Sequence, residues 1–128
     1  MIYLMIGLGG GLGAISRHFT SSFLSHVSLM GLPLGTLAVN IIGCLLIGAF
    51  VANQDETSSS VTEYFFIIGF LGSFTTFSAF TKEALIFFNQ ENFLISFLYI
   101  FITIMLCLIS TYIAVSYTHL TLPTNREV

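Results

Sequence analysis

Four long apolar stretches, separated by short polar connections, constrain this chain more than any other feature. They cover residues 2–24, 34–52, 61–88 and 93–115 of the 128-residue sequence. The hydrocarbon core of a bilayer is about 30 Å thick, and a helix needs about 20 apolar residues to cross it. Only 7% of the residues are charged. The sequence therefore predicts an all-α membrane protein with four transmembrane helices, in one domain over residues 1–115.

The last residues, 116–128, change character abruptly. They read SYTHLTLPTNREV, a polar run that contains one of the two prolines of the chain. Short polar ends of this kind are commonly poorly ordered. We predict a disordered tail or an appended sequence that lies outside the functional unit.

The third apolar stretch is longer than a bilayer requires, and small and polar residues interrupt its middle. They are Gly69, Gly72, Ser73, Thr75 and Thr76. A helix broken inside a membrane leaves backbone groups that lipid cannot satisfy, so the break must face protein, water or an ion. Broken helices mark ion and substrate sites. The alternative is that these small residues only allow close packing of helices.

Two polar side chains in the first two apolar stretches are candidate site residues. Arg17 follows the glycine-rich run GLGGGLGA, whose four-residue spacing of small residues is typical of close helix packing. Its guanidinium either has a structural or ion-attracting role or extends to the membrane surface. Asn40 lies in GTLAVNIIGCLLIG. It offers neutral N–H donors, which suit either a dehydrated anion or a hydrogen bond between helices.

Hydroxyl and phenyl groups form two neighbouring rows in the second half of the third stretch. Thr75, Ser78 and Thr81 recur every third residue, and Phe77 and Phe80 lie beside them. The edge of a phenyl ring carries partial positive charge and can approach an anion, although such rows are more often packing residues. The fourth stretch adds the hydroxyls of Ser96, Thr103, Ser110 and Thr111.

Several function classes find no support in the sequence. No Ser/His/Asp set, pair of carboxylates in one span or metal-spaced His/Cys cluster occurs, so we do not expect an enzyme. The net charge is −3 and no basic run is present, which argues against nucleic acid as a partner. Cys44 and Cys107 lie in apolar stretches and are interpreted as packing residues.

Three motifs, in order along the first three stretches, resemble those of the Fluc/CrcB fluoride channels. They are GLGGGLGAISRH, GTLAVNIIGCLLIG and GFLGSFTTFSAF. The resemblance covers residues 1–115 and implies a four-helix subunit that forms an antiparallel homodimer in the lipid bilayer, with two pores and a central sodium ion. It implies passive export of fluoride through the bacterial inner (plasma) membrane, which lowers cytoplasmic fluoride.

The resemblance also implies roles for individual residues. The carbonyls of Gly72 and Thr75 would hold sodium, and Arg17 corresponds to an arginine of the family's first helix. Ala79 departs from the pattern, because the family commonly has Thr there. Residues expected along the fluoride path are Asn40, Phe77, Ser78, Phe80, Thr81, Glu83, Ser110 and Thr111, with the choice between the last two left open.

Two other functions are compatible with a small four-span chain. A multidrug exporter of this size needs a carboxylate in its first span for proton exchange, and residues 2–24 contain none. A membrane scaffold protein would explain the glycine-rich packing. It would not explain Asn40, the hydroxyls and the two phenylalanines together.

The connections between the spans carry no signal for orientation. Residues 25–33, 53–60 and 89–92 contain neither Lys nor Arg. Since an excess of these residues on one side sets the orientation of membrane proteins, we predict insertion in both directions.

Dual insertion can be tested by labelling. In a variant without Cys44 and Cys107, a Thr57→Cys substitution should react with a membrane-impermeant thiol reagent from both sides of the membrane, in comparable amounts. Labelling from one side only would show a single orientation.

Overall fold

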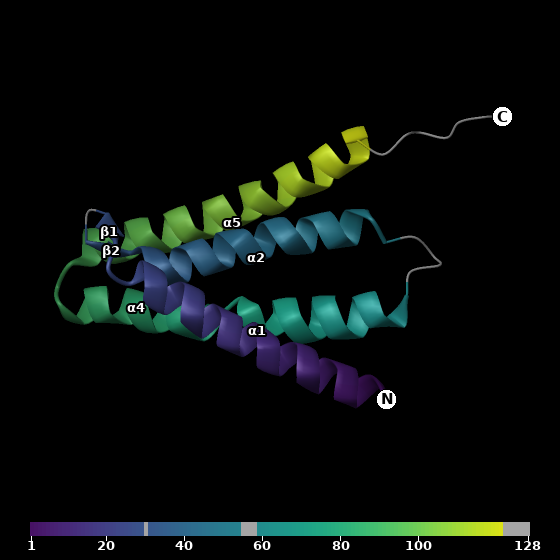
Figure 1. The fold of residues 1–128 in the computed structure, drawn as a ribbon. Helices are drawn as coiled ribbons and strands as arrows, with labels where there is room; N and C mark the ends of the chain where they lie inside the picture. The colour runs from purple at the N-terminus through teal and green to yellow at the C-terminus, as the bar shows by residue number, and fades with distance from the viewer. Residues whose placement is uncertain (30, 55–58, 122–128) are drawn as a thin grey trace.

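The computed structural model describes residues 1–29, 31–54 and 59–121 as helices that run up and down beside one another, with one short hairpin (Figure 1). Both ends of the described chain lie at the end opposite the hairpin. The elements are α1 (Ile2–Leu24), β1 (Ser28–Leu29), β2 (Leu32–Pro33), α2 (Leu34–Ala52), the π-helix η1 (Thr62–Leu71), α3 (Gly72–Phe74), α4 (Phe77–Asn89) and α5 (Phe93–Thr121).

The predicted bounds of the first two helices, 2–24 and 34–52, are confirmed. Between them lies an antiparallel pair of two-residue strands, β1 and β2, which the sequence did not predict. Gly31 has φ +80°, a conformation that costs glycine little, and this value lets the chain reverse between the strands. The connection between α2 and η1 falls partly on residues 55–58, outside the described residues.

The predicted interruption of the third apolar stretch is confirmed. η1 and α3 lead to Thr75 with ψ 151°, and Thr76 is also extended, with φ −146° and ψ 117°. Helix α4 then begins at Phe77, and the Thr76 hydroxyl caps it by accepting a hydrogen bond from the Ala79 N–H. Two extended residues therefore divide this stretch into separate helical parts.

Glycines on one face of α1 determine how closely it packs against η1. A Cβ atom at Gly9 would lie 2.2 Å from the Phe65 carbonyl oxygen, and one at Gly13 would lie 2.2 Å from that of Phe70. The opposite face carries Gly7 and Gly11, where an added Cβ meets nothing within 4 Å in the described protomer. The close packing predicted from the glycine spacing is confirmed for Gly9 and Gly13.

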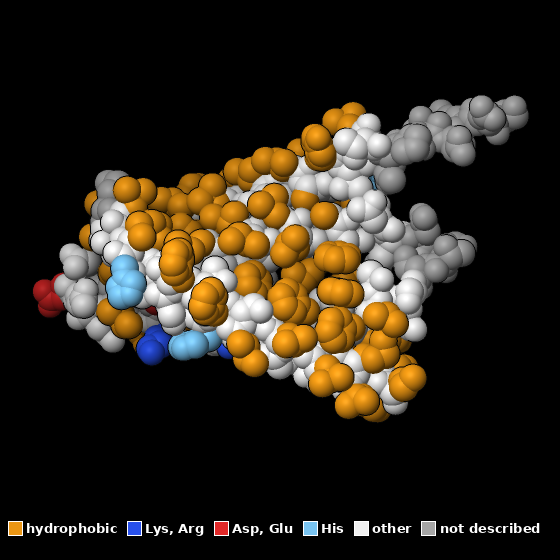
Figure 2. Space-filling view, in the orientation of Figure 1, with side chains coloured by type: hydrophobic (Ala, Val, Ile, Leu, Met, Phe, Trp, Pro, Cys, Tyr) orange, Lys and Arg blue, Asp and Glu red, His pale blue; other side chains and the backbone are white. Residues whose placement is uncertain are grey.

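The outer surface suits a bilayer. Hydrophobic side chains cover the long sides of the molecule in Figure 2. Three of the described helical stretches, Leu34–Ala52, Thr62–Asn89 and Phe93–Thr121, are long and apolar enough to cross a membrane. Helix α1 has 23 residues, but its glycines, Arg17 and His18 make it less apolar. Its membrane crossing stays a prediction.

The last helix differs from the expected boundary. α5 continues to Thr121, so residues 116–121 of the predicted tail are helical. The Thr118 and Thr121 hydroxyls donate to carbonyls one turn earlier, which lets polar residues extend the helix. The rest of the predicted tail, 122–128, lies outside the described residues.

The glycine contacts on α1 predict opposite effects of one substitution at two positions. Gly13→Ala forces a methyl group against the Phe70 backbone and should lower the free energy of unfolding by about 1–3 kcal/mol. Gly7→Ala adds a methyl group in open space and should be neutral or stabilising by up to about 1 kcal/mol. Unfolding in detergent, followed by circular dichroism, measures both, and equal losses of stability would contradict this packing.

Candidate functional site: a polar route beside the broken helix

The Asn40 side chain lies against the helix break and pairs with the backbone of Thr76. Its Oδ1 accepts from the Thr76 N–H at 2.8 Å, and its Nδ2 donates to the Thr76 carbonyl at 3.0 Å. Both residues are buried, each with 8% of its surface exposed. An unpaired buried backbone group costs about 1–3 kcal/mol, so this pairing offsets much of the cost of the break.

The same break frees two carbonyl groups. In a continuous helix the Gly72 carbonyl would accept from the Thr76 N–H, and the Thr75 carbonyl from the Ala79 N–H. Here those N–H groups donate to Asn40 Oδ1 and to the Thr76 hydroxyl instead. Neutral carbonyl oxygens of this kind are suitable ligands for a hard cation. The donor set at Gly72 and Thr75 therefore fits the sodium ion that the resemblance implies.

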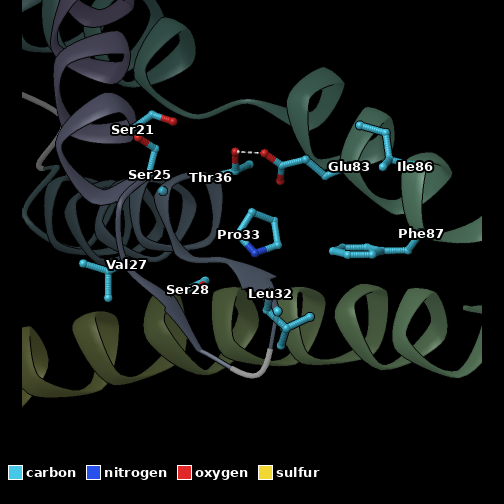
Figure 3. Close-up of a pocket in the computed structure, with 12 residues that line it drawn as sticks. Ser21, Ser25, Val27, Ser28, Leu32, Pro33, Thr36, Glu83, Ile86 and Phe87 are labelled. Atoms are coloured by element: carbon cyan, nitrogen blue, oxygen red, sulfur yellow. Dashed lines mark hydrogen bonds between the residues drawn. The ribbon is translucent and has the colours of Figure 1, made fainter. Parts of the chain in front are cut away.

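A second polar cluster joins three helices around Glu83 of α4. One carboxylate oxygen accepts from the Thr36 hydroxyl of α2 at 2.6 Å (Figure 3). The other accepts from the Tyr99 hydroxyl of α5 at 2.5 Å. Hydrogen bonds to a charged group are worth about 1.5–3 kcal/mol each, so this cluster fixes α4 against both neighbours.

Sequence reasoning did not identify Thr36 and Tyr99. A usable signal existed for each of them. Thr36 lies one helical turn before Asn40, and Tyr99 one turn before Thr103, so each extends a polar row on its helix. Both are buried, Thr36 with 3% of its surface exposed and Tyr99 with none.

The two predicted phenylalanines lie together but differ in exposure. The ring centroids of Phe77 and Phe80 are 5.4 Å apart. Phe80 is 5% exposed and packs against Tyr99, with 5.6 Å between ring centroids. Phe77 is 75% exposed and extends beyond the protomer. One ring therefore belongs to the interior of this chain, and the other is available to a neighbour.

Three cavities follow one another from the hairpin toward the middle of the molecule. The first, of about 330 Å³, lies at the hairpin end and is lined by Thr36, Glu83 and the serines of α1 and β1 (Figure 3). The second, of about 130 Å³, is lined by Arg17, Thr36 and Thr76. The third, of about 300 Å³, is lined by Asn40, Thr76, Phe80 and Thr103. Neighbouring cavities share lining residues, Ser21 and Thr36 between the first two and Thr76 between the last two.

The other predicted residues of the path have different surroundings. Ser78 and Thr81 are exposed on α4, where the Ser78 hydroxyl lies 3.2 Å from that of Thr76 and the Thr81 hydroxyl donates to the Ser78 carbonyl. Ser110 is buried, and the Thr111 hydroxyl donates to the carbonyls of Cys44 and Cys107.

On the fourth span, the structure therefore brings a different residue to the cavities. Thr103 lines the cavity beside Asn40, whereas neither Ser110 nor Thr111 lines it. Ala79 lines the cavity beside Arg17, at the position where the family pattern has a hydroxyl. The pore roles of Ser110 and Thr111 stay predictions.

The chemistry of this lining is largely neutral. Hydroxyls, one amide and phenyl rings lie among aliphatic and cysteine side chains, and Arg17, His18 and Glu83 lie toward the hairpin end. Within the described residues, no three His, Cys, Asp or Glu side chains gather as a metal site. The arrangement can supply hydrogen bonds to a small anion along a route.

Comparison with known proteins agrees with this geometry. Residues 4–115 match the family described as CrcB-like protein, Camphor Resistance (CrcB). The chain belongs to the CrcB family. This assignment confirms the resemblance found in the three motifs, and with the apolar helices it makes the chain a multi-pass bacterial membrane protein.

Named relatives cover most of the chain. A protein of Campylobacter lari is 41% identical over 111 residues, which span 86% of this chain and 91% of the relative. A protein of Flavobacterium psychrophilum is 38% identical over 84% of this chain and 88% of its own. A protein of Hahella chejuensis is 37% identical over 91% of this chain and 94% of the relative. Each carries the name fluoride-specific ion channel FluC.

The pairing at the break predicts how two buried polar residues affect stability. Asn40→Leu leaves the Thr76 N–H and carbonyl without partners and should lower the free energy of unfolding by about 2–4 kcal/mol. Thr103→Val is the matched control, because the Thr103 hydroxyl is buried and has no hydrogen-bond partner among the described residues. Its replacement should be neutral or stabilising.

Denaturation in detergent, followed by circular dichroism, measures both variants. Equal stabilities for Asn40→Leu and the parent would show that the Asn40 amide does not hold the break.

Proposed function

We propose that the chain is the subunit of a fluoride-selective channel that exports fluoride passively across the bacterial inner membrane and so lowers cytoplasmic fluoride. One observation supports this most directly. Hydroxyl groups, the Asn40 amide and phenyl rings are among the residues that line three neighbouring cavities of the helical bundle. The relatives named as fluoride-specific channels support the choice of ion.

Fluoride is small and strongly hydrated, so a route must replace its water without binding it too tightly to leave. Asn40 meets this requirement. Its amide carries two N–H groups. One donates to Thr76, which fixes the amide in place, and the other can donate to an anion in the adjoining cavity. The edges of the Phe80 and Phe77 rings add partial positive charge without a full cation.

The two charged side chains near the hairpin end have distinct proposed roles. Arg17, beside the second cavity, attracts anions toward the route. Glu83 holds the Thr36 and Tyr99 hydroxyls in place through the two hydrogen bonds that it accepts. The Thr36 hydroxyl then lies along the path at a defined position, and Ser78 and Thr81 extend the polar surface on α4.

One protomer does not enclose this route. Phe77 is largely exposed, and a further cavity of about 420 Å³, lined by Phe77, Phe80, Thr81 and Ser96, opens on the outer side of α4 and α5. A second copy in the antiparallel orientation would cover this face and give two equivalent pores. The absence of Lys and Arg from the connections, which permits both insertions, supports this arrangement.

Sodium completes the proposed dimer. The freed carbonyls of Gly72 and Thr75 from each copy would hold one ion at the twofold axis, where its charge stabilises the two breaks. Sodium supplies no reaction there.

The fluoride route is tested by two substitutions in the third cavity. Asn40→Asp places a carboxylate where an anion passes. Two unit charges about 4 Å apart repel by about 4 kcal/mol at an effective dielectric constant of 20, so fluoride transport should nearly stop. Phe80→Ile removes the ring edge and should slow transport. Fluoride and chloride efflux from liposomes with purified protein gives the rates.

Phe97→Ile is the matched control, because Phe97 is 64% exposed on α5, away from these cavities. Its transport should stay near that of the parent. Size-exclusion elution checks that each variant assembles. Normal fluoride efflux from assembled Asn40→Asp and Phe80→Ile dimers would place the route elsewhere.

The sodium site is tested by ion replacement. Exchange of sodium for a large organic cation should lower the thermal stability of the dimer, because the carbonyls of Gly72 and Thr75 lose their ligand. Thr75→Ser keeps both carbonyls and should retain the sodium dependence. Stability that does not change with sodium concentration, in the parent and in Thr75→Ser alike, argues against a bound ion.

A further inference from the structure

The third cavity contains two thiols that the proposed channel does not use. Cys44 of α2 and Cys107 of α5 are free, half-buried, and both line it. Their side chains lie next to each other. The Thr111 hydroxyl donates to the carbonyls of both residues at 3.2 Å, which ties the two helices together at this level. The sequence predicted that these two cysteines are packing residues, and the fold brings them together.

A buried hydroxyl lies close to the same cavity. Thr103 is one helical turn before Cys107, is 4% exposed, and has no hydrogen-bond partner for its hydroxyl among the described residues. The Tyr99 hydroxyl is nearby but donates to Glu83. A buried hydroxyl without a partner is uncommon. Two cysteines therefore line one cavity, and the Thr103 hydroxyl is buried beside them.

We propose that Cys44 and Cys107 form a binding site for a soft, thiophilic cation of the Hg²⁺, Ag⁺ or Cu⁺ class, and that the bound ion closes the third cavity. Thiolates select soft metals. Zinc needs four ligands in a closed site, and within the described residues no third His, Cys, Asp or Glu joins the pair. Two sulfur ligands suit a two-coordinate ion.

The binding step involves no oxidation or reduction. Each thiol loses its proton to water, and each sulfur then forms one bond to the metal. The bound ion takes up space in the cavity that Asn40 and Phe80 also line. The expected block of transport rests on the proposed fluoride route, whereas metal binding does not.

The experiment measures binding and transport separately on the full-length protein, with thiols first reduced and the reductant then removed. Hg²⁺ is the probe, and its ultraviolet thiolate absorption gives the stoichiometry. The parent should bind one Hg²⁺ per chain through two thiols. Cys44→Ala and Cys107→Ser each leave a single thiol. A second ligand on the same scaffold raises the affinity for a metal by about 10²–10⁴-fold. The competitor is a monothiol, and the concentration of it that removes Hg²⁺ from these variants should be about a hundredfold lower than for the parent.

Two results would overturn the site. One is that each parent chain binds two Hg²⁺ ions. The other is that the competitor removes Hg²⁺ from the parent and from the single-thiol variants at the same concentration. Size-exclusion elution and fluoride efflux without metal confirm that each variant is folded.

Fluoride efflux with one equivalent of Hg²⁺ then tests the block. Efflux should fall at least tenfold in the parent and stay unchanged in the Cys44→Ala, Cys107→Ser double variant. Tight one-to-one binding with normal efflux would support the metal site, overturn the closure of the cavity, and place the fluoride route outside it.

Discussion

The pairing of the Asn40 amide with the Thr76 backbone is the interaction on which the rest of this structure depends. A break in an apolar helix exposes N–H and carbonyl groups that lipid cannot satisfy. One side chain on α2 supplies both a donor and an acceptor, so the chain can pass through Thr75 and Thr76 in an extended form. The same bonds free the Gly72 carbonyl and direct α4 so that Phe80 meets Tyr99. Without Asn40, a continuous helix would be the less costly conformation.

Much of the architecture could be predicted, because a bilayer limits what an apolar chain can do. Hydropathy located α1 and α2 to the residue, and the glycines, serine and threonines of the third stretch indicated its break. The π-helical form of η1 and the short hairpin were not predictable in this way. Both depend on contacts between segments, such as the approach of the η1 backbone to Gly9 and Gly13.

The site was only partly predictable for a related reason. Asn40 is conspicuous because an amide is rare in an apolar helix. Its partner is the Thr76 backbone, which turns toward Asn40 only when the helix is broken. Tyr99 looks like one more aromatic residue until Glu83 of another helix accepts from its hydroxyl. On α5, spacing alone could not decide which hydroxyls face the cavities. Contact with α2 and α4 decides this, and it selects Thr103.

The charged and histidine side chains visible in Figure 2 lie mainly toward the hairpin end of the protomer. On this face the described residues therefore differ in charge between the two ends, and parallel copies would place every hairpin end on one side of the membrane. In the proposed antiparallel pair, each face of the membrane would receive one hairpin end, so the two asymmetries would cancel and the current–voltage relation would be symmetric about zero. Net flow then follows the gradients alone. An inside-negative membrane potential favours the exit of a monovalent anion by about 2.3 kcal/mol per 100 mV, so the resting cell drives efflux without any coupled energy source.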